Sequence, residues 1–169
     1  VRNRHKYQAG YVVGIAGSPG MSGAAILSSY AALYSGAGIV RLLHPDGMQV
    51  ELATAPYELI KSPYDTMPKD ELIELLNKAS ALYIGPGFGR TQENKSFLKE
   101  ILPHFNKACV LDADALYHCA DKDISLPPKA ILTPHHGEMR RLLGEKDDEG
   151  LTPEFLQRCQ EYSSSYNVI

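Results

Sequence analysis

Short apolar runs alternate with helix-like segments along most of this chain, and that alternation restricts its fold more than any other feature. Five runs have the length and apolar content of buried strands: 11–16, 39–43, 81–84, 108–111 and 129–132. Helical spacing or composition marks the segments between and after them: 22–35, 70–78, 91–102, 113–120, 136–143 and 153–164. The sequence therefore predicts an α/β fold, with a three-layer, mostly parallel central sheet flanked by helices.

The stretch 44–68 and the last residues follow this rhythm less clearly. Residues 50–53 are predicted as a short strand, and Pro56, Pro63 and Pro68 interrupt regular structure after it. Residues 166–169 have the composition of the start of another buried strand, which would need a further element to cover it. We therefore expect residues 1–169 to be one α/β domain that is incomplete at its C-terminus, the N-terminal part of a larger domain. The alternative is an edge strand that simply ends.

Charge and hydropathy exclude several classes of function. Lys and Arg total 17 against 20 Asp and Glu, so the net charge is -3 and no basic excess is available to bind nucleic acid. No apolar run reaches the roughly 18 residues of a membrane span, and the polar amino end lacks the pattern of a secretory signal. Cys109, Cys119 and Cys159 have neither metal nor disulfide spacing, which favours core thiols in a cytoplasmic protein.

Four loops at the predicted carboxyl ends of strands carry glycine, carboxylate or histidine residues: 17–25, 85–90, 112–116 and 133–138. Ligands of parallel sheets bind beyond these strand ends. Glycines in the first two loops let the backbone approach a ligand closely, and the helices that follow present free N–H groups to an anion. Neither loop has the Walker A or G-x-G-x-x-G pattern, and tight structural turns are the alternative.

The other two loops supply side chains suited to chemistry. Asp112 and Asp114 follow a strand end, where they could hold Mg²⁺ through water or orient a hydroxyl, although one is expected to cap the next helix. His135 would stand at the mouth of the crevice with Glu138 nearby, and a purely structural histidine is the alternative. HExxH and GxSxG are absent, so zinc and a serine nucleophile are not supported. The pattern indicates a phosphorylated, nucleotide-like ligand.

Taken in order, these motifs resemble one known family. They are His5-Lys6, Ala16-Gly17-Ser18, Ser22-Gly23-Ala24-Ala25, Ser35-Gly36-Ala37-Gly38, Val40-Arg41-Leu42, Gly85-Pro86-Gly87-Phe88-Gly89, Asp112-Ala113-Asp114-Ala115-Leu116 and Thr133-Pro134-His135-His136-Gly137-Glu138. From about His5 to Gly144 the chain is similar to the ADP- or ATP-dependent NAD(P)H-hydrate dehydratases, which belong to the ribokinase-like superfamily. The Asp-Ala-Asp-Ala-Leu form resembles the bacterial, ADP-using branch.

The resemblance implies a reaction and a set of contacts. The family repairs hydrated NADH and NADPH: it phosphorylates the ring hydroxyl from ADP (or ATP) with Mg²⁺, and phosphate then leaves to restore NAD(P)H, a hydro-lyase activity that also releases AMP. By motif, the residues expected to contact the NAD(P)H hydrate are Ala24, Gly87 and His135. The secondary candidates, for ordering Mg²⁺-bound water, are Asp112, Asp114 and Glu138.

The resemblance also concerns what these 169 residues do not contain. The family's Gly-Gly-Thr-Gly-Asp segment supplies the anion hole, much of the AMP contact and the catalytic aspartate, and it would lie beyond Ile169. We therefore expect little dehydratase activity from this chain alone. Relatives assemble as homo-oligomers, and an NAD(P)H-hydrate epimerase is a fused or separate partner. His136 stands where the family usually has Pro, which we expect to loosen this loop.

Two other functions stay open at this stage. A small-molecule kinase of the same superfamily, acting on a sugar or vitamin alcohol, would use the same crevice. A non-catalytic nucleotide-binding module would not need the missing segment. The sequence places no ribose-reading acid and no arginine for a 2′-phosphate, so it does not decide between NADH hydrate and NADPH hydrate.

Overall fold

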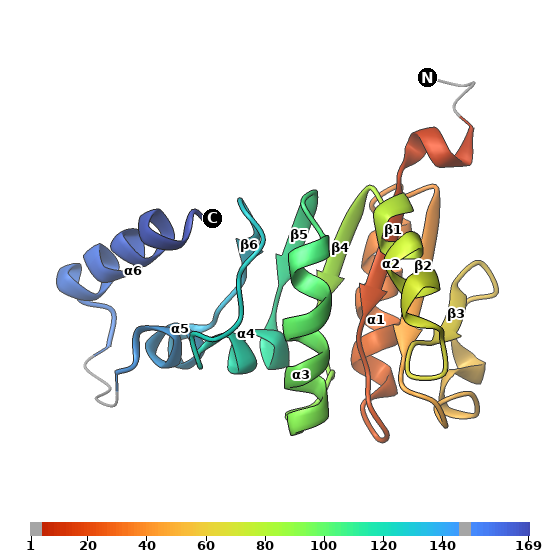
Figure 1. Ribbon diagram of the computed structural model, residues 1–169, viewed down its shortest axis with the longest axis horizontal. Coiled ribbons are helices and arrows are strands. Elements are labelled where there is room, and N and C mark those ends of the chain that lie inside the picture. The colour runs from red at the N-terminus through yellow and green to blue at the C-terminus, as the bar shows by residue number, and fades with distance from the viewer. Residues whose placement is uncertain (1–4, 146–149) are drawn as a thin grey trace.

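The computed structural model describes residues 5–145 and 150–169, and this part of the chain forms one parallel sheet. Its six strands lie in the order β3-β2-β1-β4-β5-β6. They are β1 (Tyr11–Ile15), β2 (Ile39–His44), β3 (Ile60–Pro63), β4 (Ala81–Ile84), β5 (Ala108–Leu111) and β6 (Ile131–Leu132). The predicted α/β fold with a parallel central sheet is confirmed (Figure 1).

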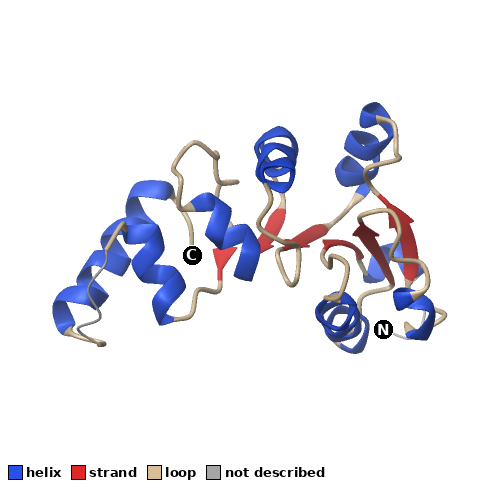
Figure 2. Ribbon diagram, turned by 90° about the horizontal axis from the view of Figure 1, so that it is seen from below, coloured by secondary structure: helices blue, strands red, loops and turns tan. Residues whose placement is uncertain are grey.

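Helices cover both faces of this sheet. The α-helices are α1 (Ser22–Tyr34), α2 (Lys69–Lys78), α3 (Gln92–Ile101), α4 (Ala113–Cys119), α5 (His136–Leu143) and α6 (Pro153–Tyr166). Short 3₁₀ helices are η1 (Lys6–Ala9), η2 (Glu51–Thr54) and η3 (Leu102–His104). Helices α2 and α3 lie on one face and α1 lies on the other, as Figure 1 and Figure 2 show. This is the three-layer arrangement that the alternation of strands and helices predicts.

Side chains that alternate along β4 divide the core between the two faces. Leu82 and Ile84 pack with α2 and α3, whereas Tyr83 packs on the α1 side. Gly14 of β1 leaves room for the Tyr83 ring, because a Cβ at this glycine would lie 2.0 Å from it. The Tyr83 hydroxyl then lies 2.8 Å from that of Ser29 on α1. A small residue and a large one on neighbouring strands thus help to position α1.

The order of the strands reverses between β1 and β4. From β1 the chain proceeds outward through β2 and β3, and from β4 it proceeds the other way through β5 and β6. In open parallel sheets, the crevice beyond the carboxyl ends of the strands at such a reversal is where ligands bind. The loops that follow β1 and β4 therefore occupy the favoured position for a ligand site.

Most predicted elements are confirmed, but the region 44–68 is not as predicted. The expected strand at 50–53 is wrong: η2 occupies Glu51–Thr54, and Leu52 is the residue that it buries. The strand β3 was not predicted, because it is short and ends at Pro63. A proline is tolerated there since β3 lies at the edge of the sheet, paired with β2 alone.

The last residues pair alongside β6, in agreement with the predicted start of another strand. Asn167 ends α6 in the left-handed region with φ 51°. The N–H of Ile169 donates to the carbonyl of Ala130 over 2.9 Å, and the N–H of Leu132 donates to the carbonyl of Ile169 over 2.8 Å. These two bonds, from both sides of one residue, have the pattern of a parallel ladder.

The cysteines behave as predicted for core residues. Cys109 and Cys119 are buried and Cys159 is half-buried, and all three are free thiols. Burial raises the pKa of Cys109 and of Cys119 to about 12, so neither is a thiolate at neutral pH. In the part of the chain that the structure describes, no helix is both long enough and apolar enough to cross a membrane.

Candidate active site

The four predicted loops lie together at the carboxyl edge of the sheet, where the strands end in Figure 1. Each loop is hydrogen-bonded to the next: Gly17 N–H to the Pro86 carbonyl, Gly89 N–H to the Asp114 carboxylate, and the Thr133 hydroxyl to the Asp112 carboxylate, each over 2.9 Å. The loops after β1, β4, β5 and β6 thus form one continuous edge. The sequence prediction that these segments meet is confirmed.

Gly87 packs directly against the start of α1. A Cβ added to Gly87 would lie 3.1 Å from the Ala24 Cβ and 3.0 Å from both the Cβ and the carbonyl oxygen of Met21. Its φ of +64° also lies in the region that favours glycine. The Ser18 hydroxyl donates to the Gly87 carbonyl over 2.8 Å. Ala24 and Gly87, two of the three predicted substrate contacts, are therefore neighbours.

Side chains from α3 and α4 hold the end of the same loop. The Asp114 carboxylate accepts hydrogen bonds from Gly89 N–H over 2.9 Å and from Arg90 Nε over 2.6 Å. Asn94 donates to the Phe88 carbonyl over 2.7 Å, and His118 Nε2 donates to the Gly89 carbonyl over 3.0 Å. The geometry makes Asp114 a residue that positions the loop after β4.

Asp112 occupies the junction of β5 and α4. One of its carboxylate oxygens, Oδ1, accepts the Thr133 hydroxyl, whereas Oδ2 accepts no hydrogen bond from the described residues. Asp112 stands at the N-cap position of α4, but its side chain makes no capping bond. The next residue, Ala113, has φ 47°, a left-handed backbone that is uncommon outside glycine. Such strained residues gather at functional sites.

His135 stands at the N-terminus of α5 with an exposed ring. Its Nδ1 accepts the Gly137 N–H over 3.1 Å, so the proton of the neutral ring is assigned to Nε2. Glu138 accepts the His135 N–H over 3.0 Å, and its second oxygen lies 3.4 Å from His135 Nε2. The histidine side chain is 73% exposed and the glutamate only 10% exposed. Glu138 therefore positions His135, whose ring is exposed at this edge of the sheet.

His136 packs against the start of α6. Its Nε2 lies 3.2 Å from the Gly150 carbonyl, and its ring meets Phe155 edge-on with centroids 4.9 Å apart. Arg140 Nε donates to His136 Nε2 over 3.1 Å, and the Arg140 guanidinium lies 4.9 Å from the Phe155 ring. His136 therefore connects α5 to α6, and the loosening expected from the sequence stays a prediction.

The candidate metal ligands do not form a metal centre by themselves. Among residues 5–145 and 150–169, no group of three His, Cys, Asp or Glu side chains is close enough together to hold an ion. Asp114 and Glu138 use their carboxylates to hold loops, as described above. Asp112 Oδ2 and Glu138 Oε1 both lack a hydrogen bond from the described residues, but Glu138 Oε1 lies 3.4 Å from His135 Nε2, whereas Asp112 Oδ2 has no ion-pair partner among them.

The sequence prediction missed several residues that shape this edge. Ser18 and Thr133 belong to the recognised motifs but were given no role, and Asn94 and His118 were not considered. Asn94 lies three residues after the Thr91 cap of α3, so its backbone role is visible in the sequence. Its side-chain bond to the Phe88 carbonyl is not, because it depends on how the loop folds back on the helix.

Comparisons with known proteins identify the family of this chain. The family model described as NAD(P)H-hydrate dehydratase matches residues 12–169. A bifunctional NAD(P)H-hydrate repair enzyme from Moorella thermoacetica is 38% identical in an alignment 151 positions long, which covers 83% of this chain and 28% of that protein. The ATP-dependent (S)-NAD(P)H-hydrate dehydratase 1 of Puccinia graminis is 34% identical in an alignment 168 positions long, which covers 87% of this chain and 42% of that protein. The chain therefore spans well under half the length of these relatives.

Solved structures share the fold. A ribokinase-like superfamily protein from Enterococcus faecalis superimposes with a TM-score of 0.85 at 24% identity, over 99% of this chain and 59% of the other. The ADP/ATP-dependent NAD(P)H-hydrate dehydratase from Bacillus subtilis, co-crystallised with ATP/Mg²⁺, superimposes with a TM-score of 0.69 at 23% identity, over 98% of this chain and 58% of the other. With the family model matching nearly the whole chain, the protein belongs to the NAD(P)H-hydrate dehydratase family.

Proposed function

We propose that this chain supplies the substrate-binding side of an ADP- or ATP-dependent NAD(P)H-hydrate dehydratase. The hydrated dinucleotide would lie along the carboxyl edge of the sheet, in contact with Ala24, Gly87 and His135. The observation that supports this most strongly is the placement of Gly87 against Ala24 at the reversal of strand order, with four loops joined around it.

The residues present can bind and orient this ligand. Gly87 has no side chain, so the loop backbone lies close to the first turn of α1. The exposed His135 ring offers a flat surface and a polar edge, and Glu138 limits its rotation. We infer that these groups hold the ring hydroxyl of the substrate toward the phosphoryl donor.

The donor and its metal ion are proposed as ligands of the complete enzyme. Relatives are named as ATP-dependent, and the Bacillus subtilis protein was co-crystallised with ATP/Mg²⁺. When bound, Mg²⁺ supplies positive charge that offsets the phosphate charge. The described residues do not hold the ion themselves, and Asp112 is our candidate for ordering a water bound to it.

Three further predictions rest on the resemblance and on the cysteines. The bacterial relatives are named bifunctional repair enzymes, which supports an epimerase as a fused or separate partner. Assembly into a homo-oligomer and a cytoplasmic location stay predictions.

Binding of the hydrate to this chain tests the proposal. In a calorimetric titration with NADH hydrate and NADPH hydrate, we expect saturable binding. His135→Ala should weaken this binding about tenfold, because the variant loses one hydrogen bond between neutral groups and the packing of the imidazole ring on the ligand. His104→Ala is the matched control, because His104 is exposed in η3, beyond the C-terminus of α3 at the opposite edge of the sheet. Binding of sugar or vitamin alcohols in preference to either hydrate would favour a small-molecule kinase instead.

Turnover is a separate measurement. The 169 residues contain no Gly-Gly-Thr-Gly-Asp segment, so we expect little conversion of hydrated NADH in the presence of ADP and Mg²⁺. Activity near that of a full-length relative would show that the catalytic groups lie within this chain.

A further inference from the structure

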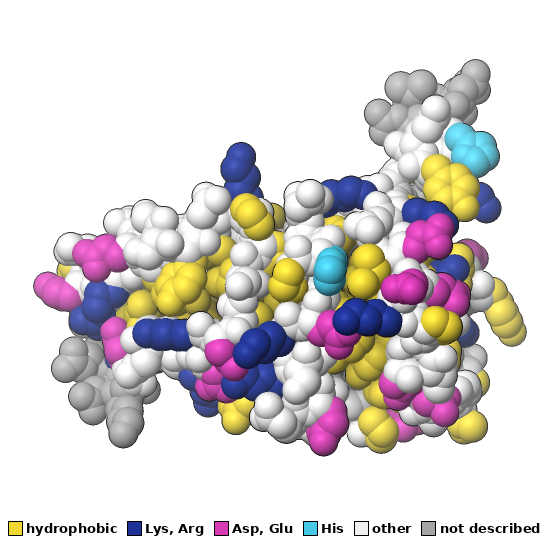
Figure 3. Space-filling view, viewed as in Figure 1, with side chains coloured by type: hydrophobic (Ala, Val, Ile, Leu, Met, Phe, Trp, Pro, Cys, Tyr) yellow, Lys and Arg dark blue, Asp and Glu magenta, His cyan; other side chains and the backbone are white. Residues whose placement is uncertain are grey.

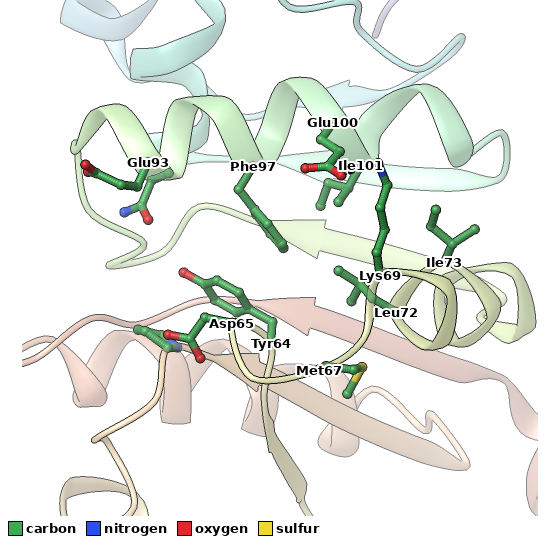
Figure 4. Close-up of a pocket in the computed structure, with 12 residues that line it drawn as sticks. Tyr64, Asp65, Met67, Lys69, Leu72, Ile73, Glu93, Phe97, Glu100 and Ile101 are labelled. Atoms are coloured by element: carbon green, nitrogen blue, oxygen red, sulfur yellow. Dashed lines mark ion pairs between the residues drawn. The ribbon is translucent and has the colours of Figure 1, made fainter.

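A pocket of about 480 Å³ lies between α2, α3 and the segment that follows β3. It is separate from the residues assigned to substrate binding. Figure 3 shows this face of the molecule, where apolar side chains are exposed between charged ones over α2 and α3. Figure 4 shows the pocket itself: Phe97 of α3 points toward Tyr64, and Lys69 of α2 extends toward Glu100 of α3.

The floor of the pocket is aromatic and aliphatic. The rings of Tyr64 and Phe97 are stacked with centroids 4.4 Å apart and an angle of 26° between them. Leu72 of α2 and Ile101 of α3 are buried beside them, and Met67 completes this apolar part. An apolar cavity of this size with few polar groups is typical of sites for small molecules.

The rim of the pocket carries an excess of negative charge. Its lining includes the carboxylates of Asp65, Glu93 and Glu100 and the single ammonium of Lys69. Lys69 is paired with Glu100, which joins α2 to α3 across one end of the pocket. Hydrogen bonds from its own backbone N–H and from Thr91 lower the pKa of Glu93, so this carboxylate is charged at neutral pH. The Asp65 carboxylate accepts the Asp46 N–H over 2.9 and 3.0 Å, and neither Asp65 nor Glu93 has a cationic partner in the lining.

The Tyr64 hydroxyl lies at the same end of the pocket as Asp65 and Glu93 (Figure 4). Within the described residues it has no hydrogen-bond partner, and it is not among the buried unsatisfied atoms, so it faces accessible space. Burial raises the pKa of Tyr64 to about 12, with a smaller effect of the nearby Asp65 charge. The hydroxyl is therefore neutral at pH 7 and free to accept a hydrogen bond from a ligand.

The pocket is in contact with the loop after β4. Asn94 lines the pocket and also donates to the Phe88 carbonyl over 2.7 Å. The Phe88 ring is fully buried, with its centroid 6.2 Å from that of Phe97 and 6.3 Å from that of Tyr64. A ligand that moves the stacked rings of Tyr64 and Phe97 would therefore also displace Phe88, the residue that follows Gly87.

We propose that this pocket is a second ligand site, which binds a small organic ammonium ion with an aromatic or aliphatic body. The body lies against Tyr64 and Phe97, and the ammonium group lies toward Asp65 and Glu93, where the aromatic rings add cation–π attraction. The proposal does not depend on the dehydratase reaction, because it concerns binding alone.

Three probes of similar shape and different charge test it: 2-phenylethylammonium, 2-phenylethanol and 3-phenylpropanoate. In an NMR titration of the 169-residue chain, we expect the ammonium to bind about tenfold more tightly than the alcohol, as for a hydrogen bond to a charged group. The carboxylate should not bind saturably. Shifts should appear at Tyr64, Phe97 and the amides of Phe88 and Gly89.

Two variants test whether the Glu93 carboxylate causes the preference for the ammonium probe. Glu93→Gln should weaken binding of the ammonium at least threefold and leave the alcohol unchanged. Glu74→Gln is the matched control, because Glu74 is an exposed glutamate of α2 that pairs with Lys78 and does not line this pocket. The proposal is overturned if no probe binds, if all three bind equally, if the shifts lie elsewhere, or if both variants have the same effect.

Discussion

The loop after β4 and the loop after β6 both carry a residue that we propose as a substrate contact, but these two loops are held in different ways. Residues 85–90 are bound by side chains from three other segments: Ser18, Asn94, Asp114 and His118. His135 is held locally, because its N–H donates to the Glu138 carboxylate and its ring accepts the Gly137 N–H. One loop depends on long-range contacts and the other on a helix cap.

The position of Gly87 depends on contacts between distant segments, whereas the position of His135 depends on neighbouring residues. Ser18 is 69 residues from Gly87, and Asp114 is 25 residues from Gly89, so these bonds exist only once the sheet has brought the strands together. The cap at His135 spans three residues and forms with the first turn of α5. Damage to tertiary packing should therefore displace Gly87 before it displaces His135.

The largest effect is expected from Gly85→Ala, at the end of β4 beside the residue that follows β5. The added Cβ would lie 1.7 Å from the Asp112 carbonyl oxygen, on a backbone with φ +126°. We expect the free energy of unfolding in urea to fall by about 4 kcal/mol, from strain and from overpacking together. Gly20→Ala is the control, since Gly20 has φ +81° but no atom within 4 Å of the new Cβ. Gly20→Ala should lower the free energy of unfolding by only about 1 kcal/mol, because it adds backbone strain but no steric overlap. Equal costs for the two variants would contradict the packing argument.

An intermediate effect is expected from Asp114→Ala. The side chain is 16% exposed, and its removal leaves the Gly89 N–H and the Arg90 guanidinium without their acceptor. We expect a loss of about 2 kcal/mol in urea unfolding, together with shifts of the Phe88 and Gly89 amides in NMR spectra.

Asp121→Ala is the matched control for Asp114. This aspartate is 58% exposed and pairs with Lys95, so its loss should change stability by no more than about 0.5 kcal/mol. If Asp114→Ala costs no more than the control, then Asp114 does not hold the loop after β4.

The smallest effect is expected at Glu138, in the locally held loop. Glu138→Gln keeps an oxygen that accepts the His135 N–H, so the free energy of unfolding should change by no more than about 0.5 kcal/mol. Glu138→Ala removes that acceptor and should cost about 1 kcal/mol. Gln and Ala variants with the same cost would show that the contact between the Glu138 carboxylate and His135 Nε2, rather than the cap, carries the stabilisation.

Much of the fold could be predicted because its signals are local. The strands at 81–84 and 108–111 and the helix at 136–143 have the predicted bounds, since apolar runs and helix caps are properties of neighbouring residues. The strand β3 could not be found in this way. It has four residues, of which Ile60 is exposed at the edge and Pro63 is a poor strand former, and it exists because β2 offers a partner.

The site was predictable in its location and less so in its roles. The loops at the strand ends could be identified from glycine, carboxylate and histidine positions. From the sequence, Asp112, Asp114 and Glu138 are all candidates for ordering Mg²⁺-bound water. In the structure, Asp114 accepts hydrogen bonds with both oxygens and Glu138 contacts His135 with both, whereas Asp112 keeps one oxygen without a partner among the described residues.

The amino-acid order by itself determined the alternation of strands and helices, the set of loops at one edge of the sheet and the family. Only the tertiary structure decided which carboxylates hold loops and which aromatic rings line the pocket between α2 and α3. The physical reason is range. Periodicity, capping and glycine turns depend on residues a few positions apart, whereas the partner of a buried polar or aromatic side chain is set by how distant segments pack.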